Sequence, residues 1–409
     1  MPQFDANRET TVTDAENGLA REKIVRALYI HIPFCAKKCV YCAFYSAPPT
    51  NNQIERYCRA LLREIAIAAE IVRPKTIFFG GGTPSLLSVE QWKQLLGGME
   101  RLNLLGAEEF TIECNPATVS ADKAALWIDY GVNRVSLGIQ SFNDSILKFL
   151  GRIHDKKTAL STYDILRKAG FTNINIDLIF GIPGQTLDDW RQTLLEAVSL
   201  QTEHISSYEL TPEEDTEYFK NFSAGAYSID EDLNSAMYDE LVEITYSAGF
   251  FRYEVSNFAK DSGNRNIQTE LNDIPSYCCR HNINYWRGGC YFGAGASASS
   301  FLNGIRRKNV SNTNLYCELL ENGKQPICEV DDIPPVSRAG EIAAFGLRMA
   351  IGWNFDEFKK MTGFDLRELW SNEMERLVNL GYATRDEKSF RLTSTGLRYA
   401  DWAGELFLK

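Results

Sequence analysis

An alternation of strand-like and helix-like segments over residues 26–259 constrains the fold more than any other feature of the sequence. Apolar runs typical of strands lie at Ala27–Ile32, Thr76–Gly80, Glu109–Asn115, Arg134–Gln140, Asn173–Gly181 and His204–Leu210. Amphipathic helical patterns lie at Asn52–Ile71, Ser88–Arg101, Ser120–Tyr130, Asp155–Ala169, Leu187–Leu200 and Asp230–Ala248. Six consecutive β-α units predict a parallel α/β fold, and with crossovers of one hand they form an open sheet or a partial barrel.

Polar and glycine residues gather where the predicted strands end. Gly80–Gly82 closes the second strand, Glu113 the third and Gln140 the fourth. Asp177 lies within the fifth strand, and Glu209 lies at the end of the sixth. In α/β barrels the carboxyl ends of the strands hold the active site. We therefore expect these residues to surround one mouth of the fold.

The pattern changes after residue 259, and four parts are predicted along the chain. Residues 1–25 are polar and mixed in charge, which predicts a flexible lead-in, and residues 26–260 form the partial barrel. Residues 261–330 combine a polar linker with an aromatic and glycine-rich segment. Residues 331–409 show helical patterns at Ala339–Gly352, Asn354–Thr362 and Leu366–Leu380, then a short strand pair near Tyr382–Thr393. Helices followed by a hairpin predict a mainly helical, winged-helix-like domain.

The composition indicates the cellular compartment of the protein and the kinds of partner that it binds. No apolar run approaches the ~20 residues that span a bilayer, and residues 1–26 lack the apolar region of a signal peptide. A cytoplasmic protein without a membrane span is expected, and its ten cysteines are expected to be thiols or metal ligands. The net charge of −11, and the excess of acidic over basic residues in 331–409, disfavour nucleic-acid binding. A DNA-binding role for the C-terminal domain is the alternative.

Cys35, Cys39 and Cys42 form a C-x3-C-x2-C motif directly after the first predicted strand. Three thiolates on one loop can bind three irons of a [4Fe–4S] cluster and leave the fourth iron open, whereas four cysteines saturate such a cluster. A structural zinc site is the alternative, but it needs a fourth ligand. His31 could supply it, yet it falls in the alternating strand, where packing or hydrogen bonding beside the cluster is expected.

This motif, placed after the first strand of a six-fold β-α repeat, resembles that of the radical S-adenosylmethionine (SAM) enzymes. In that family the open iron chelates the amino and carboxylate groups of SAM. The reduced cluster cleaves SAM to methionine and a 5′-deoxyadenosyl radical. The resemblance implies three requirements for this chain: a [4Fe–4S] cluster on the three cysteines, SAM, and an electron donor for the cluster.

Further segments resemble the coproporphyrinogen-dehydrogenase-like branch of the family. They are Gly80–Leu86 (GGGTPSL), Glu113–Pro116, Arg134–Phe142, Gly151–His154 and Asp177–Gln185. The resemblance implies a SAM pocket lined by Tyr29, Gly81, Gly82, Thr83, Glu113, Gln140, Arg152 and Asp177. Thr83 stands where the family usually has an acid. A carboxylate such as Asp177 can accept hydrogen bonds from ribose hydroxyls or an ammonium group, and Arg152 can hold a carboxylate in a fork.

Two features separate the members of this branch. Oxygen-independent coproporphyrinogen III oxidases carry a further cysteine two positions after the third, where this chain has Phe44. The segment from His281 to Trp286 reads H-N-x2-Y-W, which resembles the signature of the HemW-type heme chaperones. In that group the histidine is implicated in heme binding. A neutral imidazole is a normal ligand of heme iron, and Tyr285 and Trp286 offer flat apolar surface to a porphyrin.

Other candidate ligands lie near His281. Cys278, Cys279 and Cys290 are possible soft ligands, since a thiolate also binds heme iron, but buried thiols are the favoured interpretation. The family often has a histidine after the segment Gly293–Gly295, whereas this chain continues with Ala296–Ser300. The sequence therefore provides His281 as the one predicted histidine contact to heme.

The resemblance implies a radical SAM heme chaperone that delivers heme to apo-hemoproteins of respiration. Membrane-associated partners and a homodimer are compatible with it. The first alternative is an oxygen-independent coproporphyrinogen III oxidase, which converts a propionate to a vinyl group by radical oxidative decarboxylation. Methyl transfer and radical heme-ring opening are further porphyrin-directed alternatives. Phe44 disfavours the decarboxylase, no catalytic residue is assigned, and whether the chain is an enzyme stays open at this point.

Overall fold

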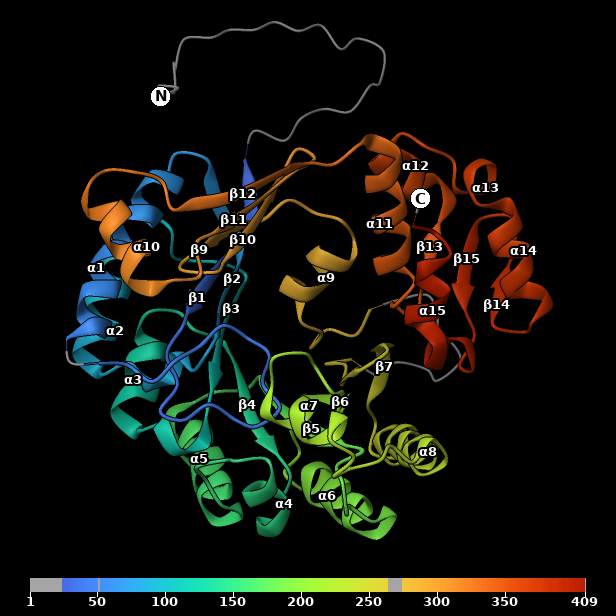
Figure 1. Ribbon diagram of the computed structural model, residues 1–409, viewed down its shortest axis with the longest axis horizontal. Helices are drawn as coiled ribbons and strands as arrows, with labels where there is room; N and C mark the ends of the chain where they lie inside the picture. The colour runs from blue at the N-terminus through green and yellow to red at the C-terminus, as the bar shows by residue number, and fades with distance from the viewer. Residues whose placement is uncertain (1–23, 51, 264–273, 409) are drawn as a thin grey trace, which may run out of the picture.

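The computed structural model describes residues 24–50, 52–263 and 274–408, and its largest element is an open sheet (Figure 1). The strand order is β7-β8-β6-β5-β4-β3-β2-β1-β9. Its six central strands are parallel neighbours, with bounds β1 Val25–Ile32, β2 Val72–Gly81, β3 Glu109–Cys114, β4 Arg134–Gln140, β5 Ile174–Phe180 and β6 His204–Glu209. Each lies within a few residues of its prediction. Strands β7 and β9 lie at the two edges of the sheet, so the sheet does not close into a full barrel. The predicted partial (β/α)6 barrel is therefore confirmed.

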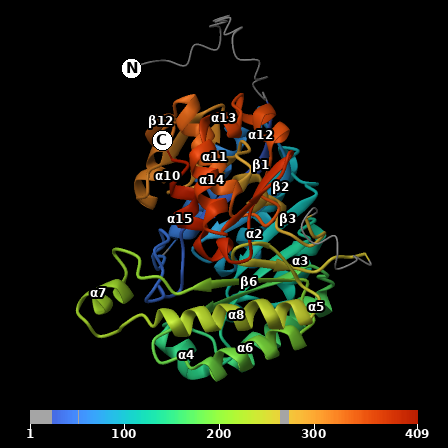
Figure 2. The same ribbon diagram turned by 90° about the vertical axis from the view of Figure 1, so that its right-hand side faces the viewer.

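Helices between the strands share one hydrophobic core with the sheet. Their bounds are α1 Gln53–Ala68, α2 Val89–Arg101, α3 Ala121–Asp129, α5 Lys156–Ala169, α6 Leu187–Ser199 and α8 Glu231–Ser247. Local capping fixes several ends, since Ser88 and Thr186 open α2 and α6 with capping boxes. Gly170 closes α5 at a φ of 106°, a left-handed conformation that glycine adopts readily. Figure 2 shows α6 and α8 side by side along one edge of the molecule.

Several short elements extend this framework beyond the prediction. They are α4 Asp144–Phe149, α7 Glu217–Ser223, β7 Phe251–Glu254, β8 Asn257–Ala259, α9 Arg280–Trp286 and β9 Phe292–Ala294. Strand β8 pairs with β6 in antiparallel fashion, and β7 pairs with β8 in the same way. Strand β9 adds to the other side and pairs in parallel with β1, so that Leu28 lies opposite Phe292. Strand β1, which precedes the loop of Cys35, Cys39 and Cys42, is therefore an interior strand of the finished sheet.

Residues 299–332 form a small antiparallel sheet and a helix that pack against the barrel. The bounds are β10 Ser299–Leu302, β11 Ile305–Asn309, α10 Thr313–Glu321 and β12 Ile327–Asp332. The buried carboxylate of Glu64, on α1, accepts hydrogen bonds from Tyr316, Asn309 and the backbone N–H of Gly295. Burial raises the pKa of Glu64 to about 7, against the lowering effect of these bonds. This carboxylate joins the segment to the first helix of the barrel.

The C-terminal residues form a separate core around Trp353, Phe358, Trp370 and Phe407. The elements are α11 Pro335–Gly346, β13 Trp353–Asn354, α12 Phe355–Thr362, α13 Leu366–Leu369, α14 Ser371–Asn379, β14 Ala383–Arg385, β15 Ser389–Leu392 and α15 Ala400–Glu405. Helices and a hairpin are present as predicted, with two differences. Helix α11 begins four residues earlier than predicted, with a proline at its start, and ends at Gly346, six residues before the predicted end. The predicted helix over 366–380 is interrupted at Trp370.

The predicted lead-in falls almost wholly on residues 1–23, which lie outside the described residues. The four-part division of the chain stays a prediction. In Figure 1 helix α9 lies between the sheet and the C-terminal helices, and it contacts both β2 and α11. Among the described residues, no helix combines the length and apolar character needed to cross a bilayer.

Candidate functional site

The three motif cysteines lie on the loop that follows β1, and each is partly exposed. Hydrogen bonds from outside the loop reach two of their sulfurs. The Thr83 hydroxyl donates to Sγ of Cys35 at 3.3 Å, and the Arg152 guanidinium donates to Sγ of Cys39 at 3.4 Å. Donors of this kind stabilise anionic sulfur, whether as a free thiolate or as a cluster ligand. The environment of Cys35, Cys39 and Cys42 therefore suits thiolate ligands.

His31 is the candidate fourth ligand of the alternative zinc site. Within the described ranges, no three His, Cys, Asp or Glu side chains come together in a way that suits one metal ion. His31 does not complete a zinc site, since its Nδ1 lies 3.0 Å from the Tyr29 hydroxyl and its Nε2 lies 3.0 Å from the Tyr45 carbonyl oxygen. The prediction that His31 hydrogen-bonds beside the cysteines is confirmed.

Gly81 and Gly82 bring the end of β2 against the cysteine loop. Gly81 has a φ of 104°, and a Cβ there would lie 2.4 Å from the ring of His31. A Cβ on Gly82 would lie 2.7 Å from the carbonyl oxygen of Phe34. The backbone N–H groups of Gly82 and Thr83 donate to the carbonyls of Ile32 and Phe34, each at 2.8 Å. Only glycine permits this close approach of two backbones beside the motif.

Two partly exposed carboxyl groups, on strands on either side of β4, occur among the predicted SAM residues. Glu113, the last residue but one of β3, accepts the backbone N–H of Gly81 at 3.2 Å. Asp177, on β5, accepts hydrogen bonds from Ser136 and Asn175. Burial raises the pKa of both groups, that of Glu113 to about 8, with Asp177 contributing by its charge. A cationic ligand would lower both pKa values, so the pair fits the ammonium or sulfonium of SAM.

Arg152 contributes positive charge to this region, together with the buried Arg134 on β4. Its Nη2 donates to the Gly138 carbonyl at 2.6 Å, while its buried Nε has no hydrogen-bond partner among the described residues. Gln140 ends β4 with a φ of 70°, which a non-glycine residue rarely adopts. A Cβ on Gly138 would lie 2.9 Å from the Gln140 side chain and 3.3 Å from the Arg152 guanidinium. The three residues therefore lie together, with an unused donor that fits a ligand carboxylate.

A chain of buried hydrogen bonds connects this region with helix α9, and sequence reasoning did not predict it. Asn175 donates to Asp177 at 2.7 Å, and its Oδ1 lies 2.6 Å from Nδ1 of His204. Nε2 of His204 lies 2.8 Å from the Tyr253 hydroxyl, which accepts the backbone N–H of Cys279 at 3.0 Å. Asn175 and His204 alternate with apolar residues on β5 and β6, but nothing in the sequence pairs them with Tyr253.

Helix α9 carries His281, and its first turn is fixed by a buried carboxylate on β3. Glu109 accepts the backbone N–H groups of Arg280 and His281, both at 2.9 Å. The His281 ring is fully buried, with Nδ1 2.8 Å from the Thr76 hydroxyl and Nε2 2.8 Å from the Tyr285 hydroxyl. Burial lowers the pKa of His281 to about 3, so the ring is neutral at physiological pH. Of the two hydrogen-bonded residues His281 and Tyr285, only Tyr285 lines the central cavity that is described below.

The nearby thiols differ in accessibility. Cys278 and Cys279 are buried, and burial raises the pKa of Cys278 to about 12. The sulfur of Cys279 lies 3.7 Å from the Glu109 carboxylate, which disfavours a thiolate there. Cys290 is partly exposed. Buried thiols are thus confirmed for Cys278 and Cys279.

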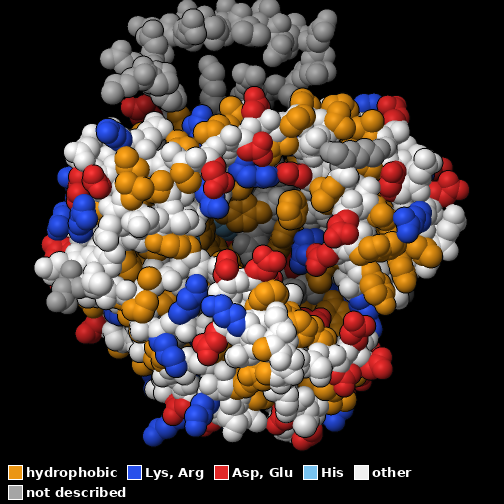
Figure 3. All heavy atoms as spheres, viewed as in Figure 1, with side chains coloured by type: hydrophobic (Ala, Val, Ile, Leu, Met, Phe, Trp, Pro, Cys, Tyr) orange, Lys and Arg blue, Asp and Glu red, His pale blue; other side chains and the backbone are white. Residues whose placement is uncertain are grey.

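A central cavity of about 740 Å³ adjoins both the cysteine loop and helix α9. Figure 3 shows the corresponding hollow in the middle of the molecule, with hydrophobic side chains inside it and charged side chains at its rim. Its aromatic lining consists of Tyr29, Phe44, Tyr45, Tyr285, Trp286, Tyr291, Phe301 and Phe345. Phe44 is 70% exposed, an unusual degree for a phenylalanine. The cavity therefore offers a flat apolar ligand a largely aromatic surface.

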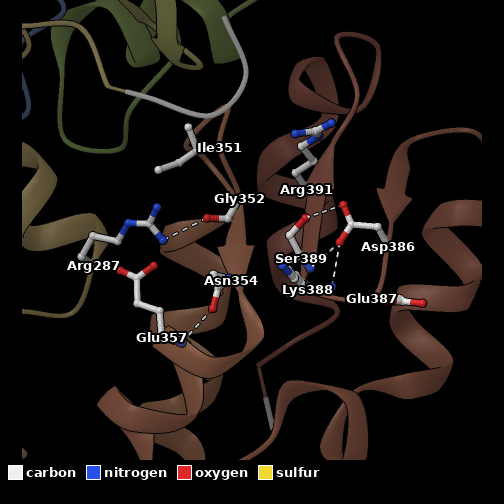
Figure 4. A pocket seen from close by; sticks show the side chains of 10 residues that line it. All are labelled: Arg287, Ile351, Gly352, Asn354, Glu357, Asp386, Glu387, Lys388, Ser389 and Arg391. Atoms are coloured by element: carbon white, nitrogen blue, oxygen red, sulfur yellow. Dashed lines mark hydrogen bonds between the residues drawn. The ribbon is translucent and has the colours of Figure 1, made fainter. Parts of the chain in front are cut away.

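A second cavity, of about 590 Å³, lies between helix α9 and the C-terminal domain and is shown in Figure 4. It contains side chains of both charges, and several are hydrogen-bonded locally. Arg287 donates to the Gly352 carbonyl at 2.9 Å, and Asp386 accepts the Ser389 hydroxyl at 3.0 Å. No predicted site residue lines it. The central cavity is therefore the better candidate for the functional site.

Comparison with known proteins agrees with this geometry. The family described as the Radical SAM superfamily matches residues 29–197, which include the cysteine loop and strands β2 to β5. A solved structure of coproporphyrinogen III oxidase (HemN) from Escherichia coli, described as a radical SAM enzyme, superimposes with a TM-score of 0.79. It covers 95% of this chain and 92% of that one at 21% identity, and so it supports the fold alone. The fold and the cysteine loop define a radical SAM protein, a class whose domain implies a [4Fe–4S] cluster and SAM.

Curated relatives specify the family. A protein named heme chaperone HemW from Lactococcus lactis is 34% identical over 93% of this chain and 96% of the relative. Proteins of the same name from Bacillus subtilis and Escherichia coli are 33% and 38% identical, over 91% and 66% of this chain and 96% and 69% of theirs. The chain belongs to the HemW family of radical SAM proteins.

Proposed function

We propose that this protein is a heme chaperone that binds heme in the central cavity and delivers it to apo-hemoproteins of respiration. The observation that carries the proposal is the position of Tyr285. Its ring lines the cavity, and its hydroxyl is hydrogen-bonded to His281, the histidine of the H-N-x2-Y-W motif. The cavity volume of about 740 Å³ lies within the range of about 300–1,000 Å³ that is usual for small-molecule sites.

The predicted SAM and cluster residues have supporting roles in this proposal. Cys35, Cys39 and Cys42 would hold the [4Fe–4S] cluster, and Glu113, Asp177 and Arg152 would hold SAM through charge and hydrogen bonds. Tyr29, Gly81, Gly82, Thr83 and Gln140 would complete the SAM pocket. When bound, the cluster supplies the electron for reductive cleavage of SAM. Phe44 and Tyr45 follow the cysteines and line the heme cavity, so the two sites share one loop.

Either Tyr285 or His281 would contact the heme iron. The imidazole is buried behind the tyrosine, and it can reach iron only if its bond to the Tyr285 hydroxyl opens. Tyrosine oxygen is itself a known ligand of heme iron. The pair therefore offers two candidate iron contacts, and substitution separates them. Tyr285→Phe removes the hydroxyl and leaves the ring, whereas His281→Ala removes the imidazole.

The test begins with anaerobically reconstituted protein and a heme titration followed by the Soret band. Wild-type protein should give a shifted, saturable Soret band, and one of the two variants should lose that shift. Loss with His281→Ala alone assigns the imidazole, and loss with Tyr285→Phe alone assigns the phenol. Absence of heme binding by the wild type would contradict the proposal. An unchanged Soret band in both variants would place heme elsewhere.

A second assay separates the chaperone from the porphyrin-directed enzymes. The protein is incubated with SAM and dithionite, once with heme and once with coproporphyrinogen III, while 5′-deoxyadenosine and porphyrins are measured. Intact bound heme without porphyrin conversion supports the chaperone. Deoxyadenosine formed in step with protoporphyrinogen would identify a decarboxylase. Loss of the Soret band together with deoxyadenosine formation would identify heme-ring opening.

A further inference from the structure

We infer that Arg338 and Arg306 form a carboxylate-binding subsite in the central cavity, which selects a tetrapyrrole with two carboxylate groups. The inference rests on the proposed function and names the chemistry of the ligand that this cavity accepts. Among the described residues that line the cavity, these two arginines are the cations and Glu341 is the acid. The residues that line the cavity therefore carry more positive than negative charge.

An aromatic path connects this charged wall to the His281–Tyr285 pair. The Tyr285 ring meets Tyr291 edge to face, with ring centroids 4.5 Å apart, and Tyr291 lies 6.3 Å from Phe301. Phe301, on β10, lies directly opposite Arg306 on β11. One side of the cavity thus runs from a polar pair suited to a metal centre, across aromatic rings, to guanidinium groups. Heme has the same order of groups, from iron through the porphyrin ring to its propionates.

Arg338 is the arginine with unused binding capacity. It lies on α11, and its buried Nε has no hydrogen-bond partner in the part of the chain that the structure describes. The neighbouring turn leaves room for the side chain because residue 304 is glycine, and a Cβ there would lie 3.2 Å from Nη1 of Arg338. A carboxylate can accept two N–H groups of a guanidinium at once. Arg338 therefore offers a ready site for one carboxylate.

Arg306 already forms an ion pair with Glu341. This pairing sets how many ligand carboxylates the subsite accepts. Its Nη2 donates to Oε2 of Glu341 at 2.5 Å, and Asp331 lies 3.9 Å away at the exposed edge. Glu341 lies one helical turn after Arg338 on α11 and forms its ion pair with Arg306. A second ligand carboxylate would share Arg306 with Glu341. Two arginines suit the two propionates of heme better than the four carboxylates of coproporphyrinogen III.

The experiment compares hemin with hemin dimethyl ester, which lacks the two negative charges, by Soret titration of the full-length protein. We expect Arg338→Met to weaken hemin binding about tenfold or more, as loss of a charge-assisted hydrogen bond does, and to leave ester binding within about twofold. Glu341→Gln removes the competing carboxylate and should tighten hemin binding, again without affecting the ester. Arg59→Met, at an exposed position on α1 outside the cavity, is the matched control.

The outcomes distinguish the two hypotheses. If wild-type protein binds hemin, and Arg338→Met weakens hemin and ester equally or neither of them, the carboxylate subsite is wrong and the heme-binding proposal stands. If wild-type protein binds neither compound, both hypotheses fail. Arg306→Met tests the second half of the subsite: selective weakening of hemin supports it, and equal hemin affinity restricts the subsite to Arg338. Circular dichroism and thermal unfolding establish that each variant is folded.

Discussion

Glu109 accepts the backbone N–H of His281 at 2.9 Å, although the two residues are 172 positions apart in the chain. The contact joins the third strand of the barrel to the helix that carries the H-N-x2-Y-W motif. Because the same carboxylate also accepts the N–H of Arg280, it satisfies two of the free donors at the start of helix α9. The orientation of His281 and Tyr285 is therefore coupled to a strand of the barrel.

Replacement of this carboxylate should destabilise the protein and disturb heme binding together. We expect Glu109→Ala to lower the free energy of unfolding by about 2–4 kcal/mol, because buried N–H groups lose their acceptor. The adjacent Glu108 is the matched control, since its exposed carboxylate forms ion pairs with Lys75 and Arg280. Glu108→Ala should cost less than about 1 kcal/mol. Urea unfolding measures both, and equal costs would contradict the anchoring role of Glu109.

Gly81 is expected to tolerate no side chain. Gly81→Ala introduces a Cβ at 2.4 Å from the His31 ring and places alanine at a φ of 104°. Gly106→Ala carries a similar backbone penalty, since its φ is 89°, but its Cβ would meet nothing within 4 Å. The positive φ alone costs about 1–2 kcal/mol. A larger loss of SAM affinity for Gly81→Ala, measured by calorimetry on reconstituted protein, would show that the close packing at the loop matters for binding.

The raised pKa of Glu113 predicts a pH-dependent difference in stability. The folded-state pKa of about 8 lies above the ordinary value of 4.5, so the folded state holds this proton more tightly. Its contribution is complete below pH 4.5 and is lost as the pH rises through 8. One such proton changes the free energy of unfolding by at most about 1.4 kcal/mol per pH unit. In unliganded protein, Glu113→Gln should therefore gain stability relative to wild type between pH 5 and 8.

Chemical denaturation at several pH values measures this difference. Glu64→Gln provides the comparison, because the pKa of Glu64 is raised only to about 7 and its gain should level off about one pH unit earlier. A constant difference between Glu113→Gln and wild type over pH 5 to 8 would show that Glu113 titrates normally. SAM should abolish the pH dependence if its cationic group pairs with this carboxylate.

We expect Arg152 to affect the reduction potential of the cluster but not to be required for binding it. The three cysteines supply the ligands, so Cys39→Ala should remove the brown colour and the bound iron. Arg152→Met should retain the iron but lower the reduction potential, because a positive charge and an N–H donor to Cys39 sulfur are lost. A redox titration followed by electron paramagnetic resonance measures the shift. Lys37→Met, which removes an exposed charge from the same loop, controls for charge alone.

Much of the barrel was predictable because its strands repeat one simple pattern. In Arg134–Gln140 and in the first half of Ile174–Phe180, apolar residues alternate with polar residues or glycine, which is a pattern typical of strands. Strand β9 could not be predicted, since its three residues, Phe292–Ala294, have no periodicity and become a strand only by pairing with β1. The interruption at Trp370 escaped prediction for the opposite reason: the apolar pattern continues through it.

The site could be predicted where its chemistry is carried by a local motif. The cysteine spacing and the glycine run identify residues that the fold brings close together, as the hydrogen bond from Thr83 to Cys35 shows. Residues that reach the site from distant parts of the chain do not belong to a local motif. Glu109, Tyr253 and Arg338 are single residues in ordinary contexts, and their positions beside helix α9 or the cavity follow from tertiary packing alone. For His281, the motif indicated a ligand, but not that Tyr285 stands in front of it.

The pairing of β1 with β9 also bears on how the protein is made. The outer edge of β1 at Leu28–Ile30 gains its partner only when Phe292–Ala294 has been synthesised. At about 5–20 residues per second, that edge of a nascent chain waits roughly 13–50 s for its last strand. An unpaired strand edge is a template for association with other chains. The interval between translation of the first and the last parallel strand is therefore when the newborn polypeptide most needs protection from aggregation.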